Sequence, residues 1–163
     1  MLIDLREIIG VPGAKTSFQF KPDLSEAIDG SIIRFKEPMD AVGKVVNRAG
    51  ALSFTADLDL VCVCVCARCL KEFELPIHQH ISVNLIEGDE DMEVSDGYFI
   101  RNDSVDANEI ICTEFILNME QRLLCSEDCP GLCERCGAVL NDGQCSCKKP
   151  IDPRLAALES LLS

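Results

Sequence analysis

The most regular alternation of apolar and polar residues in the chain runs from Leu52 to Cys66. Apolar or cysteine side chains occupy every second position of this segment, and polar residues fill the positions between them as far as Asp59. A period of two places alternate side chains on opposite faces of a β-strand. From Val61 onward both sets are apolar, so the far end of this long strand is expected to be covered on both faces or bent by a bulge.

A second alternating run predicts an antiparallel partner for this strand. Its apolar positions are Phe73, Leu75, Ile77, Ile81, Val83 and Leu85. The turn between the two strands then holds Cys66 and Cys69 at the tip of a hairpin. His78 and His80 fall on the face opposite Ile77 and Ile81, and we expect them to be solvated rather than to bind metal.

Shorter apolar stretches predict the other strands. Residues 2–5 and 18–20 suggest a short strand or helical turn followed by a strand. Residues 31–40 contain Pro38, which favours a strand near a sheet edge. Val42 to Val46 leads into Asn47-Arg48-Ala49-Gly50, a hairpin signal.

The segment after the second long strand predicts a loop, a short strand and a helix. Residues 87–96 are acidic without periodicity and predict a loop, and residues 98–100 predict a short strand. Asp106 and Glu109 match a helix capping box. The apolar residues that follow predict an amphipathic helix continuing into Cys125; they are Ile110, Ile111, Phe115, Leu117, Leu123 and Leu124.

Asp152-Pro153 predicts the start of a short terminal helix. Its apolar stripe would be Leu155, Leu158, Leu161 and Leu162. The chain is therefore expected to adopt an α+β fold: an antiparallel sheet of about five or six strands, a packed helix and a C-terminal cysteine-rich zinc module. We expect residues 1–124 to form the sheet and helix and residues 125–163 the metal module and terminal helix, within one continuous domain.

Six of the eleven cysteines lie between Cys125 and Cys147. Cys133 and Cys136 stand two residues apart before Gly137, which permits a positive φ, and Cys145 and Cys147 follow a group of turn-forming residues. Four thiolates in this arrangement predict a tetrahedral zinc site. A cluster of buried or disulfide-paired cysteines and an iron–sulfur cluster are the alternatives.

The remaining cysteines raise the question of a second site. A strand follows Cys66 and Cys69, whereas a thioredoxin-type redox pair needs a helix there, so this pair favours a zinc knuckle. Together with Cys125 and Cys129 it would supply four further ligands, the number that a second site requires. Alternatively, Cys125 and Cys129 bind no metal and neither does the hairpin pair. The other cysteines, Cys62, Cys64 and Cys112, are interpreted as buried core thiols.

Composition and charge limit the classes of function. The net charge is −13, and between Glu87 and Asp128 thirteen acidic residues stand against two basic ones. Such a surface disfavours nonspecific nucleic-acid binding and suits a basic protein partner, unless it is only a solvated face. Charges at Asp4, Arg6 and Glu7 do not fit a signal peptide, and no apolar run is long enough to span a membrane, so we expect a cytoplasmic protein. The chain contains no GxSxG, HExxH or phosphate-binding loop, which makes an enzyme the weaker hypothesis.

Three motifs together resemble the YceD-like family, the large ribosomal RNA subunit accumulation proteins. They are CxRCL at Cys66 to Leu70, CxxxCxGLCxxCGxxLN followed by CxC, and DPRLxxL, and the resemblance covers roughly residues 50–161. It implies a non-enzymatic factor needed for 23S rRNA accumulation during large-subunit assembly. The family's cysteines fall on Cys66, Cys69, Cys125, Cys129, Cys133, Cys136, Cys145 and Cys147.

The resemblance leaves the partner open between 23S rRNA and a basic ribosomal protein. Direct RNA contact would have to come from a small basic group: Arg135, Lys148, Lys149 and Arg154. The acidic face would instead shield a cationic ribosomal protein until delivery. A thiol-based redox or metal sensor, in which Cys66 and Cys69 form a disulfide, is the hypothesis from another class.

Overall fold

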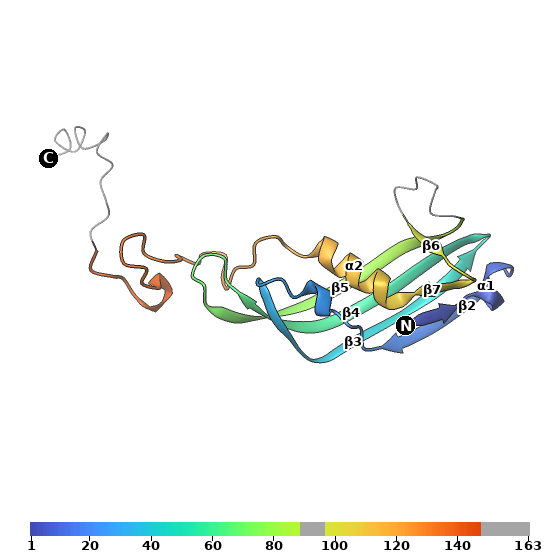
Figure 1. Cartoon of the computed structure of the whole chain (residues 1–163), viewed down its shortest axis with the longest axis horizontal. Helices are drawn as coiled ribbons and strands as arrows, with labels where there is room; N and C mark the ends of the chain where they lie inside the picture. The colour runs from blue at the N-terminus through green and yellow to red at the C-terminus, as the bar shows by residue number, and fades with distance from the viewer. Residues whose placement is uncertain (89–96, 148–163) are drawn as a thin grey trace, which may run out of the picture.

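One long sheet organises the molecule, which the computed structural model describes over residues 1–88 and 97–147 (Figure 1). The sheet has five strands in the order β2-β3-β4-β5-β6. They are β2 (Lys15–Phe20), β3 (Ile32–Arg48), β4 (Ala51–Val65), β5 (Glu72–Glu87) and β6 (Tyr98–Ile100). All neighbours are antiparallel except β5 and β6, which are parallel. The predicted α+β fold and antiparallel sheet are confirmed, with one parallel pair added at the edge.

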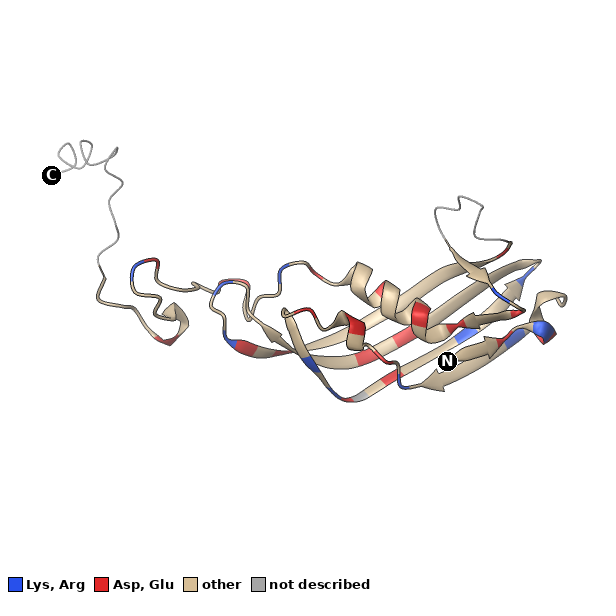
Figure 2. Cartoon of the chain, in the orientation of Figure 1, with Lys and Arg blue, Asp and Glu red and all other residues tan. Residues whose placement is uncertain are grey.

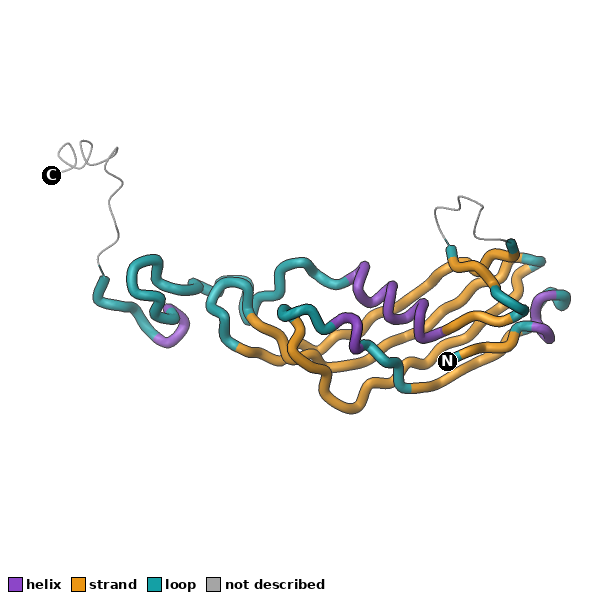
Figure 3. Tube along the Cα trace, viewed as in Figure 1, coloured by secondary structure: helices purple, strands orange, loops and turns teal. Residues whose placement is uncertain are grey.

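The remaining elements are short. A separate two-stranded antiparallel sheet pairs β1 (Leu2–Asp4) with β7 (Ser104–Asp106). The helices are α1 (Arg6–Ile9), the 3-10 turns η1 (Ser25–Ala27) and η2 (Leu140–Asp142), and α2 (Ala107–Asn118). Figure 3 shows α2 and η1 lying along one face of the long sheet. α1 lies at one end of the long sheet, and the cysteine-rich segment extends from the other end (Figure 1).

The core forms where the alternating face of β4 meets α2. Every even-numbered residue of β4 from Leu52 to Cys64 is buried, and Phe54 and Leu58 have no exposed surface. Phe115 of α2 is equally buried and makes an edge contact with Phe35 of β3, with ring centroids 5.8 Å apart. The predicted period of two is confirmed, and Cys62 and Cys64 are core thiols as expected.

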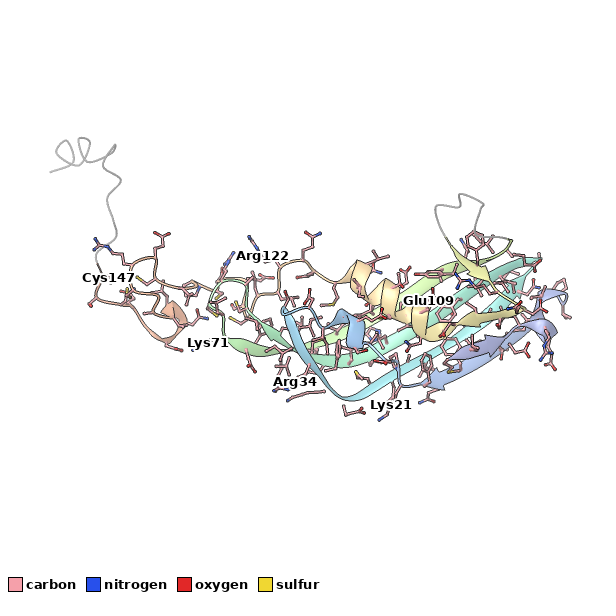
Figure 4. The ribbon with its side chains drawn as sticks, in the orientation of Figure 1. Lys21, Arg34, Lys71, Glu109, Arg122 and Cys147 are labelled. Atoms are coloured by element: carbon pink, nitrogen blue, oxygen red, sulfur yellow. The ribbon has the colours of Figure 1, made fainter. Side chains whose placement is uncertain are left out.

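The other face of β4 is covered at its far end only. Val63 points away from the core, yet only 3% of it is exposed. Two ion pairs reach across β4 from its neighbours: Arg34 of β3 lies 3.8 Å from Glu72 of β5, and Lys36 pairs with Glu74 (Figure 4 labels Arg34). Arg34 stands directly opposite Val63 in the register and therefore lies on the same face of the sheet, beside the valine.

The two strand segments predicted before residue 47 form a single strand, β3. Its pairing with β4 is irregular between Lys36 and Asp40, the stretch that contains Pro38, a residue with no N–H to donate. β2 pairs only with the part of β3 from Ala41 to Val46. The earlier part of β3 is therefore a local edge in the described residues, as the proline suggested.

The turn between β3 and β4 is a two-residue hairpin with positive φ at Ala49 (55°) and Gly50 (97°), as the sequence predicted. Asn47, 1% exposed, anchors it. Its side-chain Nδ2 donates to the carbonyl oxygens of Ile8 and Ile9 at 2.8 and 2.9 Å, and its Oδ1 accepts from the Gly50 N–H at 2.8 Å. One side chain thus joins the hairpin to α1.

Replacing Asn47 with alanine is expected to lower the free energy of unfolding by about 2 kcal/mol, because it leaves buried backbone groups without partners. Urea unfolding followed by far-UV circular dichroism measures the change. Asn84→Ala, at an exposed position of β5, is the control and should stay within about 0.5 kcal/mol of the parent. Equal values for the two variants would contradict the anchoring role.

The prediction that the helix continues into Cys125 was wrong, because α2 ends at Asn118. The predicted N-cap is confirmed: Asp106 accepts from the Asn108 N–H at 2.9 Å. At the other end the Asn118 side chain donates to the Glu114 carbonyl at 2.8 Å, and Met119 is extended. Leu123 is buried in the main core, and its carbonyl accepts from the Ala67 N–H at 2.8 Å, which joins this segment to the hairpin tip. Of the predicted acidic loop over residues 87–96, Glu87 belongs to β5 and residues 89–96 lie outside the described residues, as does the segment predicted to form a terminal helix.

Candidate metal centre

Eight cysteines come together in two groups of four, with the sulfur atoms of each group within 4.8 Å of one another. The hairpin cluster consists of Cys66, Cys69, Cys125 and Cys129, and the terminal cluster consists of Cys133, Cys136, Cys145 and Cys147. These are the eight residues that the sequence singled out, in the grouping that the ligand count suggested. None of the eleven cysteines forms a disulfide.

The two CxxC turns share one backbone geometry. In the hairpin cluster the N–H of Leu70 donates to the carbonyl of Cys66 at 3.0 Å, and the N–H of Cys66 donates to the carbonyl of Lys71 at 2.9 Å. The terminal cluster repeats both bonds at 2.8 Å, from Gly137 to Cys133 and from Cys133 to Ala138. The residue after the second cysteine has a positive φ in each turn.

That φ is 59° at Leu70 and 69° at Gly137. Leucine rarely adopts this conformation, and Leu70 is also 64% exposed. The hairpin turn therefore contains a strained backbone conformation at Leu70 and exposes the apolar side chain of that residue. Sequence reasoning recognised the glycine but missed Leu70, whose only signal is its position in a second CxRC sequence.

The sulfur spacing fits a single zinc ion in the hairpin cluster. Zinc–thiolate bonds of about 2.3 Å in a tetrahedron place neighbouring sulfurs about 3.8 Å apart. The Sγ atoms of Cys66 and Cys129 are 3.8 Å apart, and those of Cys69 and Cys125 are 3.7 Å apart. Sulfurs this close could enclose one ion but leave no room for a cluster of several irons. Four sulfur donors suit zinc, so both groups could hold such an ion.

Backbone N–H groups favour the thiolate form of the first cysteine in each turn. The N–H groups of Cys136 and Arg135 lower the pKa of Cys133 to about 6. Burial alone would raise the pKa of Cys66, but N–H groups of Cys125, Cys69 and Arg68 outweigh it and bring that pKa to about 6. A metal ligand must be deprotonated, so these donors prepare the sulfurs for a cation.

Cys125 and Cys147 contrast with these two cysteines. Burial raises the pKa of Cys125 to about 12. The hydrogen bond between the Cys147 and Cys136 side chains raises the pKa of Cys147 to about 12, because a second thiolate beside the first is unfavourable. A bound dication would remove this repulsion. Burial also raises the pKa of Cys62 to about 12 and the pKa of Cys112, which keeps these core sulfurs protonated.

Residues around the sulfurs connect the hairpin to the terminal segment. The Arg68 guanidinium donates to the carbonyls of Glu127 and Cys129, both at 3.0 Å. Gly131 lies so close that an added Cβ would come 3.1 Å from the Arg68 carbonyl oxygen. Arg68 thus holds the loop that carries Cys125 and Cys129, a role that sequence reasoning did not assign.

The two clusters are also joined to each other. Asn141, the middle residue of η2, donates from Nδ2 to Cys125 Sγ at 3.5 Å, and Val139 packs against the buried sulfurs of the hairpin cluster. Lys71 forms an ion pair with Asp142. Figure 4 labels Lys71 beside the hairpin and Cys147 at the outer end of the terminal cluster. These contacts connect the segment between Cys136 and Cys145 to the hairpin cluster.

Other sequence candidates lie elsewhere. His78 and His80 are exposed to solvent, as expected, and bond to Asp59 and Asp57 at 2.5 and 2.7 Å. Arg135 lies in the terminal CxxC turn. Lys148, Lys149 and Arg154, the other predicted RNA contacts, lie outside the described residues. Within residues 1–88 and 97–147, no helix is long and apolar enough to cross a membrane.

The region that contains both clusters matches a known family. Residues 54–162 match the family model described as large ribosomal RNA subunit accumulation protein YceD. The chain belongs to the YceD family. The matched region of this YceD chain contains all eight clustered cysteines, and the resemblance drawn from the sequence motifs is confirmed.

Among curated proteins, this YceD chain is similar to the uncharacterized proteins Rv2926c of Mycobacterium tuberculosis and Mb2951c of Mycobacterium bovis. Each is 30% identical over 105 residues, which are 60% of this chain and 49% of the relative. The chain therefore spans about half the length of these curated relatives. YlbN of Bacillus subtilis is 26% identical over 161 residues, which cover 91% of this chain and 90% of YlbN. No solved structure gives a significant match.

Proposed function

We propose that this chain is a non-enzymatic factor for 23S rRNA accumulation and large ribosomal subunit assembly, and that two bound zinc ions give its C-terminal segment the shape needed for this role. The YceD family match over residues 54–162 supports the ribosomal part. The two groups of four sulfurs carry the structural part. We expect the protein to act in the cytoplasm, where ribosomes assemble.

The proposed ligands are the eight cysteines of the two clusters: Cys66, Cys69, Cys125 and Cys129 for one zinc, and Cys133, Cys136, Cys145 and Cys147 for the other. Because every ligand is a thiolate, neither ion has a protein-activated water or an open position for catalysis. The zinc ions would fix the hairpin tip against residues 119–147. The described part of this segment contains few apolar residues of its own to bury, so metal binding supplies the order that packing does not.

The proposed partner is a cationic ribosomal protein. The net charge of −13 favours a cationic partner over RNA phosphate. Figure 2 shows acidic residues, all of them Glu, on α2 and η1, the layer that covers one face of the sheet. If the chain instead contacts 23S rRNA directly, the proposed contacts are Arg135, Lys148, Lys149 and Arg154.

Depletion of the protein in cells tests the ribosomal role. The ratio of 23S to 16S rRNA should fall, and large-subunit precursors should accumulate in sucrose gradients. A wild-type copy should restore both, whereas a copy with Cys133→Ser should restore them only in part. An unchanged ratio after full depletion would refute the proposal.

A thiol sensor is the second candidate, favoured by the pKa of about 6 at Cys66 and Cys133. This candidate requires that mild oxidant link Cys66 to Cys69 and release metal. Mass spectrometry after thiol alkylation measures the linkage. Full protection of both thiols by zinc under oxidant would exclude it.

A further inference from the structure

The β5 edge facing away from β4 carries no strand over most of its length. β4 pairs with β5 from Glu72 to Leu85, whereas β6 pairs only with Leu85 to Glu87 on the opposite side. In the described residues no other strand pairs with that side between Glu72 and Asn84. Apart from Pro76, which has no N–H, alternate residues of this stretch direct N–H and C=O groups toward the open side, the usual template for an added strand.

A groove lies along this edge, between β5 and the C-terminal half of α2. It consists of two hollows that follow one another along β5. Gln79 lines the first of them, and its Nε2 donates to the carbonyl of Glu114 at 3.0 Å. One hollow, of about 300 Å³, is lined by residues of β5 from Leu75 to Gln79 and by Asn118, Met119, Glu120 and Leu123. The other, of about 400 Å³, is lined by Ser82, Val83, Asn84, Gly97, Tyr98, Glu114 and Leu117.

The groove offers apolar side chains along its length. Leu75, Ile77 and Val83 face the core but remain half-buried, because no strand lies beyond them. On the helix side, Leu117 is 72% exposed. The side chains of an added strand alternate between two faces, so every second one would reach these residues.

The charge of the groove indicates the chemistry of its occupant. Glu114 and Glu120 line the two hollows, and no lysine or arginine among the described residues lines either one. Arg122 lies beyond the end of α2, toward the hairpin tip (Figure 4). A second copy of the chain would bring another net charge of −13 to this edge, and RNA would bring phosphates.

We propose that the β5 edge from Leu75 to Asn84 binds an extended cationic segment of a partner protein as an additional strand of the sheet. None of the eight clustered cysteines lines the groove, so this site is separate from the proposed zinc ions. The strand would supply main-chain hydrogen bonds to β5, apolar side chains to the groove and basic side chains to the glutamates.

The test uses the full-length, zinc-loaded protein and a fluorescent peptide of alternating lysine and valine, about ten residues long. Anisotropy measures its dissociation constant, and amide NMR shifts locate it. We expect binding that shifts the residues of β5 between Leu75 and Asn84. A peptide methylated on alternate backbone nitrogens keeps its charge but loses edge donors, and should bind about tenfold more weakly.

Leu117→Lys should weaken binding about tenfold, because it removes an apolar contact and repels the peptide. Val42→Lys is the matched control: it is 49% exposed, adds the same charge and faces away from α2. Equal weakening by both variants would reduce the effect to bulk charge and overturn the proposal. So would equal binding of the methylated peptide, preferential binding of an RNA oligonucleotide at this edge, or dimerisation of the chain through it.

Discussion

Replacing Cys69 with serine is expected to lower the zinc content from two ions to one and to detach residues 119–147 from the hairpin tip. Cys69 lies in the hairpin cluster, where its sulfur is 3.7 Å from that of Cys125. Binding of a structural zinc contributes on the order of 10 kcal/mol in small zinc domains, and a hydroxyl replaces a thiolate poorly. Native mass spectrometry counts the ions, and hydrogen exchange measures protection of the segment.

The sheet should survive this change, because its core residues lie in β4, β5 and α2. Far-UV circular dichroism should therefore keep its strand signal. Cys112→Ala provides the control, since it removes a buried thiol outside both clusters and should leave two ions bound. Two zinc ions in the Cys69→Ser protein, or none in the parent, would show that the proposed ligand set is incorrect.

Gly43→Ala is expected to lower the free energy of unfolding by about 3 kcal/mol or to prevent folding. Gly43 lies in β3 opposite Phe18 of β2. An added Cβ would come 2.4 Å from the Phe18 ring and 2.4 Å from the carbonyl oxygen of Thr55 in β4. The ring stacks on Phe54 with centroids 5.1 Å apart, so relieving the overlap would separate β3 from its neighbours or disturb this core contact.

Gly10→Ala is the matched control for this substitution. Gly10 has a φ of −89°, and an added Cβ would meet no atom within 4 Å. Its unfolding free energy should stay within about 0.5 kcal/mol of the parent or rise slightly. Thermal and urea unfolding measured side by side compare the two variants. Similar losses in both would mean that glycine matters through chain flexibility rather than through space beside Phe18.

Local patterns in the sequence predicted most of the sheet. The alternation in β4 identified its buried face because each side chain there meets the core directly, and the Ala49-Gly50 hairpin followed from turn chemistry. The end of α2 was missed since Leu117 and Leu123 fit a helical spacing. Tertiary contacts decide that end: Leu123 is bound to Ala67 of the hairpin, and Asn118 bonds back to the helix.

The candidate site was predictable in its residues and less so in its surroundings. Cysteine spacing and ligand counting gave all eight sulfurs and their grouping. The contacts of Arg68 with Cys129 and of Asn141 with Cys125 join residues far apart in the sequence, and neither follows a periodic pattern. The parallel pairing of β6 with β5 was missed for the same reason, because it depends on where the chain returns after residue 96.

The hairpin cluster unites cysteines separated by 63 residues in the case of Cys66 and Cys129. An ion held there would act as a reversible cross-link that restricts the unfolded chain, worth about 4 kcal/mol by the loop-closure relation for disulfides. Such a staple works in a compartment where glutathione keeps thiols reduced. It can close only after Cys129 has been synthesised, so metal uptake would belong to the final stage of the protein's own maturation.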